Sequence, residues 1–158
     1  MWTTLYAWPS RGLWNIMSTI NLEYDVPGDD FKLAGEASCR VKNKLKKIGY
    51  NIEAIRRVTI AMYEAEINMV IHANGGKINV EIYPNKVNIT LADNGPGIKD
   101  INKAMQEGYS TAPENIRELG FGAGMGLPNI KKYTDELKIE TEVGKGTTLF
   151  LSVHVDNK

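Results

Sequence analysis

The sequence predicts one α+β domain, a two-layer sandwich in which helices cover one face of a mixed, mainly antiparallel sheet. Two pairs of alternating apolar segments are joined by short turns, at Pro84-Asn85 and at residues 144–146, and strands joined in this way pair antiparallel. Two long segments with apolar residues at helical spacing precede the first pair. The chain has 158 residues, 42% of them hydrophobic and 24% charged, which is typical of a single soluble domain.

The expected elements follow the order strand, helix, helix, strand, strand, loop, helix, strand, strand. Alternation of apolar residues predicts strands at 20–26, 78–82, 87–91, 137–143 and 149–155. Helical periodicity predicts helices at 34–48, 52–72 and 127–135, with a short helix at 100–107. Asp29 or Asp30 is the expected N-cap of the first helix. Residues 108–126 are rich in glycine, and we expect them to be irregular.

Residues 1–16 differ in composition from the rest of the chain. They contain all three tryptophans and a single charged residue, Arg11. A signal peptide is not indicated, because Arg11 follows the apolar residues and Pro9 interrupts them. We interpret residues 1–16 as a leader outside the domain, and an aromatic arm that docks on a partner is the alternative. The domain itself is expected to span residues 17–158.

Composition excludes several classes of protein. Nineteen basic and nineteen acidic residues balance, so no overall positive charge favours nucleic acid. The single cysteine, Cys39, excludes an internal disulfide and a cysteine-rich zinc site, and it fits a reducing, cytoplasmic setting. No apolar run approaches the roughly 20 residues that span a bilayer, so we expect no membrane segment.

The charge is unevenly distributed along the chain. Residues 31–60 carry eight basic and two acidic side chains, most of the basic ones on the first predicted helix. The simplest interpretation is the solvated face of an amphipathic helix. The alternative is a docking surface for an acidic partner, because clustered charge of one sign steers association. Nucleic acid ranks third, since aromatic residues do not alternate with these charges.

The first motif that carries chemistry is E-A-E-I-N, within the second long helix. Glu64 and Asn68 are four residues apart and therefore lie on one face, whereas Glu66 points elsewhere. A carboxylate can accept a proton from a nucleophile, and an amide oxygen can coordinate Mg²⁺. Taken alone, the pair also fits a solvated helix surface.

The second motif, L-A-D-N-G-P-G-I, covers residues 91–98. A strand ends at Asp93, whose carboxylate could accept a hydrogen bond from an exocyclic amine such as that of adenine. Gly95 and Gly97 would let a flat base approach the backbone. An ordinary Asx turn is the alternative interpretation.

The third motif, G-F-G-A-G-M-G-L, places alternating glycines directly before a predicted helix. Backbone N–H groups in such a loop, together with a helix N-terminus, form a site for phosphate groups. The spacing matches neither the dinucleotide fingerprint nor the Walker motif, and a flexible hinge is the alternative.

The order and spacing of the three motifs resemble the N, G1 and G2 boxes of the GHKL (Bergerat-fold) ATP-binding domains, and Gly146-Thr147 is similar to the family's fourth element. The resemblance covers roughly residues 17–155. It implies ATP and Mg²⁺ as ligands and residues 108–125 as the lid. It also implies that Glu64 is the general base and that Asn68 binds Mg²⁺. The implied nucleotide-binding residues are Asn68, Asp93, Gly95, Gly97, Gly122, Gly124, Met125, Gly126 and Thr147.

Within this superfamily the chain resembles the small single-domain serine/threonine kinases that act as anti-sigma factors or switch kinases. The segments G-Y-S-T (108–111) and G-L-P-N-I-K-K-Y (126–133) carry this likeness. It implies transfer of the ATP γ-phosphate to a serine or threonine of a STAS-type anti-anti-sigma partner, with a sigma factor as a further partner and a homodimer as the expected state. A non-catalytic, ATP-dependent binding module and a plain ATPase are the alternatives. His72 is expected to be a helix-end residue and not a catalyst.

Overall fold

The computed structural model describes residues 19–118 and 125–155, and the strands in these ranges form one sheet in the order β1-β2-β3-β5-β4. The strands are β1 (Ile20–Pro27), β2 (Gly75–Ile82), β3 (Lys86–Ala92), β4 (Glu136–Glu142) and β5 (Gly146–His154). Each pairing of neighbouring strands in the described part of the chain is antiparallel. The predicted strands and the α+β class are therefore confirmed. The interpretation of residues 1–16 falls outside the described residues.

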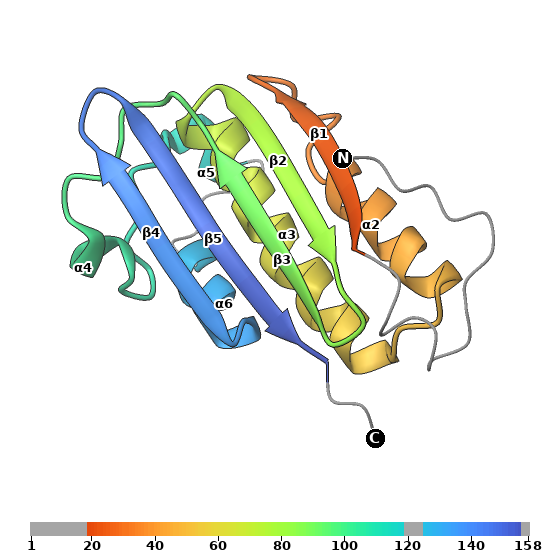
Figure 1. The fold of residues 1–158 in the computed structure, drawn as a ribbon. Coiled ribbons are helices and arrows are strands. Elements are labelled where there is room, and N and C mark those ends of the chain that lie inside the picture. The colour runs from red at the N-terminus through yellow and green to blue at the C-terminus, as the bar shows by residue number, and fades with distance from the viewer. Residues whose placement is uncertain (1–18, 119–124, 156–158) are drawn as a thin grey trace.

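The helices are α2 (Glu36–Lys47), α3 (Ile52–His72), α4 (Ile101–Ala104), α5 (Glu114–Glu118) and α6 (Gly126–Tyr133). Figure 1 shows that α2, α3 and α6 lie against the same face of the sheet, with α3 in the middle. This arrangement is the predicted two-layer sandwich.

The segment expected to be irregular contains a short helix, α5. Glycine is absent between residues 109 and 118, and the carbonyl of Pro113 accepts hydrogen bonds from the amides of Ile116 and Arg117 at 3.0 and 3.1 Å. Ile116 is buried and anchors the turn. The expectation of an irregular 108–126 was therefore wrong for this part, because the glycines lie at its two ends.

The core lies between the sheet and the three longer helices. Val58, Met62 and Ala65 of α3 are completely buried against the inward side chains of the central strands. The inward residues of the central strands are Ile78, Val80 and Ile82 of β2, Val87, Ile89 and Leu91 of β3, and Leu149, Leu151 and Val153 of β5. Because α3 packs over the centre of the sheet, residues on its flanks are presented to the space beside the core.

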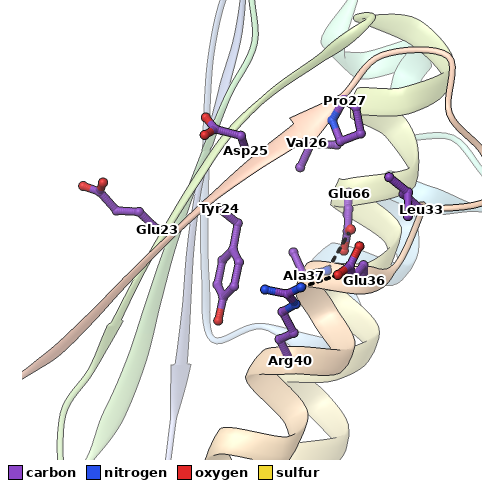
Figure 2. A pocket seen from close by; sticks show the side chains of 10 residues that line it. All are labelled: Glu23, Tyr24, Asp25, Val26, Pro27, Leu33, Glu36, Ala37, Arg40 and Glu66. Carbon is purple, nitrogen blue, oxygen red and sulfur yellow. Dashed lines mark hydrogen bonds and ion pairs between the residues drawn. The ribbon is translucent and has the colours of Figure 1, made fainter. Parts of the chain in front are cut away.

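The N-terminus of α2 is capped by a residue distant in sequence. Its N-cap position is Gly35, which has no side chain, so the prediction of Asp29 or Asp30 was wrong. The carboxylate of Glu66 on α3 takes this role. It accepts hydrogen bonds from the amides of Gly35, Ala37 and Ser38 at 3.0, 3.2 and 3.0 Å, and from the Ser38 hydroxyl. Figure 2 shows Glu66 pointing from α3 to the first turn of α2.

Glu66 is only 1% exposed, and its charge is stabilised by these donors and by the positive end of the α2 dipole. A cavity of about 240 Å³ lies beside it, between β1 and α2, and Tyr24 and Arg40 line it (Figure 2). Arg40 forms an ion pair with Glu36, one turn earlier on α2. The buried carboxylate thus joins the two long helices at the end of the domain where α2 begins.

We expect Glu66→Gln to lower the free energy of unfolding by roughly 3 kcal/mol, because hydrogen bonds to a buried charged group are each worth about 1.5–3 kcal/mol. The amide keeps the shape but turns an N–H donor toward the donors of α2. Urea unfolding followed by circular dichroism measures the change. Glu53→Gln, on the exposed first turn of the same helix, is the control and should change stability by less than about 0.5 kcal/mol. Equal effects of the two substitutions would show that Glu66 does not cap α2.

Candidate functional site

A cleft of about 750 Å³ opens beside the C-terminal half of α3. Its walls are formed by α3, the segment that follows β3, α4, residues 109–111 and the first residues of α6 and β5. Seven of the predicted site residues line it: Glu64, Asn68, Asp93, Gly97, Met125, Gly126 and Thr147. Gly122 and Gly124 lie outside the described residues. The sequence motifs, which are far apart in the chain, are therefore brought to one cavity.

Asp93 is fixed at the end of β3 by bonds to one of its carboxylate oxygens. Oδ1 accepts from the amides of Gly95 and Thr147 at 2.9 and 3.1 Å, and the Asp93 amide donates to the Thr147 carbonyl at 3.0 Å. Within the described residues, Oδ2 has no such partner, so it is free to accept from a ligand. Gly95 itself is not a lining residue; its amide positions the aspartate.

The backbone around Asp93 is tight enough to require glycine at two positions. Gly97 has φ +76°, and a Cβ there would lie 2.5 Å from the Glu142 carbonyl oxygen. Gly146 has φ +134°, and a Cβ there would lie 2.1 Å from the Asp93 carbonyl oxygen. Both turns therefore exclude side chains, which keeps the loop after β3 close to the β4–β5 turn.

A threonine that the sequence analysis did not select supports the same region. The Thr141 hydroxyl lies 2.9 Å from the Thr147 hydroxyl and accepts from the Ile98 amide at 2.8 Å. It joins β4, β5 and the segment that leads to α4. Thr141 belongs to no recognisable motif, because it lies in an ordinary alternating strand.

On α3, Glu64 and Asn68 are both half-buried and face the cleft, as their spacing predicted. The Asn129 side-chain amide of α6 donates to Glu64 Oε1 at 3.4 Å. Asn68 forms no hydrogen bond with another residue of the described ranges, and a Cβ on Gly126 would lie 3.1 Å from both terminal atoms of its amide. Asn68 therefore faces the start of α6 with its oxygen available.

His72 ends α3, as expected, but it also lines the cleft, which the sequence analysis did not predict. Burial lowers its pKa, and the nearby Asp93 carboxylate opposes this shift. Its Nδ1 lies 3.5 Å from the Thr111 hydroxyl. Its place could have been found only from the helical spacing of four between Glu64, Asn68 and His72.

Residues 108–118 and Met125 form the described part of the predicted lid. Tyr109, Ser110 and Thr111 line the cleft, and Arg117 of α5 donates to the Ser110 carbonyl at 2.8 Å. Ala112 and Ile116 are buried. This part of the segment is therefore held against the body of the domain.

The described residues contain no group of three or more His, Cys, Asp or Glu side chains able to hold a metal ion. A fully protein-coordinated metal centre is thus not formed by this part of the chain. A single amide oxygen such as that of Asn68 fits Mg²⁺ only if phosphate and water oxygens complete the shell, which is how this ion commonly binds.

Comparison with known proteins places the chain in a family. The histidine kinase-like ATPase domain matches residues 33–153, and the chain belongs to this family. It is 32% identical over 112 residues to the serine/threonine-protein kinase RsbT of Bacillus subtilis, which covers 68% of this chain and 78% of RsbT. It is 37% identical over 109 residues to the anti-sigma F factor of Caldanaerobacter subterraneus, which covers 66% of this chain and 73% of that protein.

A solved structure supports the fold. The chain is similar to the RsbU and RsbW domains of a Mycobacterium tuberculosis protein, with a TM-score of 0.60 and 16% identity. The match covers 87% of this chain and 33% of that one. The GHKL-type fold expected from the sequence is confirmed. None of the helices in residues 19–118 and 125–155 is both long and apolar enough to cross a membrane.

The lowered pKa of His72 predicts a pH dependence of stability. Above the unfolded pKa of about 6.5, His72 is neutral in both states. As the pH falls below that value, the unfolded chain binds a proton first, so stability is lost until the pH passes the lower folded pKa. We expect the free energy of unfolding to fall less between about pH 7 and about pH 5 in His72→Gln than in the unchanged protein. His154→Gln, at an exposed histidine, is the control; a flattened profile in the control and not in His72→Gln would contradict the assignment.

Proposed function

We propose that this protein is an ATP-binding regulatory kinase that transfers the γ-phosphate of ATP to a serine or threonine of a STAS-type anti-anti-sigma partner. One observation carries the proposal: Glu64, Asn68 and Asp93 line a single cleft together with the N-terminus of α6. Glu64 is suited to accepting a proton, Asn68 to binding Mg²⁺ and Asp93 to recognising a nucleotide base. The similarity to a kinase and to an anti-sigma factor supports the same function and extends the partners to a sigma factor.

Asp93 selects adenine in this proposal. Its Oδ1 is occupied by backbone amides, and Oδ2 accepts from the exocyclic amine of the base. Thr147 and Gly97 line the same region of the cleft, where the base would lie. Guanine presents a carbonyl where adenine has its amine, so two acceptors would face each other.

Asn68 and the first residues of α6 hold the phosphates. The Asn68 oxygen would hold Mg²⁺, which would supply positive charge beside the phosphates. The N-terminus of α6 adds the backbone N–H groups of Gly126 and Leu127, and a helix N-terminus favours an anion. Glu64 accepts the proton of the incoming hydroxyl, and Asn129 orients its carboxylate.

Asp93→Asn should weaken ATP binding about tenfold to a hundredfold, because an N–H donor then faces the amine of adenine in a half-buried site. The Asn oxygen can still accept from Gly95 and Thr147, so the turn itself should be kept. Calorimetry with ATP and GTP measures the effect. The native protein should prefer ATP, and equal affinity for the two nucleotides would contradict the role of Asp93. Asp25→Asn, on the exposed face of β1, is the control.

Glu64→Gln should reduce phosphate transfer at least about a hundredfold while ATP still binds, because an amide cannot accept the proton. The assay follows radiolabel from ATP to a purified STAS-domain protein, beside a measurement of ATP affinity. Glu53→Gln on the same helix is the control. Transfer at the native rate by Glu64→Gln would show that another group is the base. If the native protein binds its partner but never labels it, the protein is a binding module and not a kinase.

A further inference from the structure

Two lysines line the cleft on the side opposite α3. Lys99 follows the loop of Asp93, and Lys103 lies four residues further on, in the first turn of α4. Lys99 comes directly before Asp100, the N-cap residue of α4, whereas Lys103 lies within the helix. Both lysines are exposed and border the cleft.

The segment that carries the lysines is anchored on both sides of Lys99. The Ile98 amide donates to the Thr141 hydroxyl at 2.8 Å, and the Asp100 carboxylate caps α4 by accepting from the Lys103 amide at 3.1 Å. The side chains of Ile98, Ala104 and Met105 pack against the hydrophobic core. The apolar residues therefore fix the backbone and leave the two lysines exposed where they border the cavity.

The charges around the cleft leave a shortage of cations. Its described walls carry three carboxylates, from Glu64, Asp93 and Asp100, against Lys99 and Lys103. Neither lysine forms an ion pair with another described residue. The sequence of residues 119–124 is Leu-Gly-Phe-Gly-Ala-Gly, so this part of the lid cannot contribute a charged side chain. A triphosphate carries several negative charges, and on the described walls of the cleft Lys99 and Lys103 are the lysines that can balance them.

We propose that Lys99 and Lys103 bind the phosphates of the nucleotide and make the cleft prefer a triphosphate to the uncharged nucleoside. The proposal rests on the ATP site proposed above and assigns to it the residues that supply fixed positive charge. In this proposal Asp93 recognises the base of the nucleotide, whereas the two lysines recognise the negative charge of its phosphates.

The test compares ATP with adenosine in the full-length protein. Lys99→Gln and Lys103→Gln are made singly and together, and affinities for Mg·ATP and adenosine are measured by calorimetry at two salt concentrations. The double variant should bind Mg·ATP about tenfold more weakly, because each exposed lysine adds only a modest attraction to a phosphate group. Its affinity for adenosine should stay the same, and its ATP affinity should depend less on salt. Lys46→Gln/Lys47→Gln, at the exposed end of α2, changes the net charge equally and should leave both affinities unchanged.

Each other result overturns the proposal. An unchanged ratio of ATP to adenosine affinity in the double variant would show that the lysines do not contact phosphate. A parallel loss of both affinities would show that they support the fold of the cleft or the base site. A loss of phosphate transfer with native ATP affinity would assign them to the acceptor protein. Failure of the unchanged protein to bind ATP would instead overturn the proposed function itself, and so is distinguished from these results.

Discussion

The buried carboxylate of Glu66 is the contact on which the helical layer depends. The N-cap residue of α2 is a glycine, which has no side chain to cap the helix. The Glu66 carboxylate of α3 accepts four hydrogen bonds there in place of a local cap. A charge that is 1% exposed persists only when donors surround it, so α2 and α3 cannot move apart at this point without leaving it unpaired. The cap therefore fixes the helix that carries the cleft residues, because Glu66 lies between Glu64 and Asn68 in sequence.

α3 contacts the sheet, α2 and the cleft with three different faces, because successive residues are rotated by about 100° around the helix axis. Val58, Met62 and Ala65 face the sheet, Glu66 faces α2, and the cleft side carries Glu64, Asn68 and His72. Near its other end, Arg57 pairs with Asp135 at 2.8 Å and so joins α3 to the start of β4. The same helix thus contributes to the core, to the contact with α2 and to the cleft.

The strands and the two long helices could be predicted from the sequence because alternation and helical periodicity are local signals. The cap of α2 could not, because its carboxylate lies 28 residues or more from the amides that it binds. α5 was missed because the glycines around it dominated the interpretation of the segment. The order and spacing of the motifs predicted that Glu64, Asn68 and Asp93 share one site, and all three line the cleft. Asn129 and Thr141 contact the lining residues Glu64 and Thr147 only through tertiary structure, and they carry no sequence signal.

The order of the side chains along α3 determines how a bound nucleotide would be oriented in the cleft. His72 lies beside Asp93, Asn68 is one turn earlier and faces the start of α6, and Glu64 is a further turn away, next to Asn129. At 1.5 Å per residue, His72 and Glu64 are about 12 Å apart along the axis. In the proposed function a nucleotide whose base lies at Asp93 must therefore extend its phosphates past Asn68 toward Glu64. In the same proposal the Glu64 carboxylate meets the acceptor hydroxyl at that far end, so its negative charge is kept away from the base.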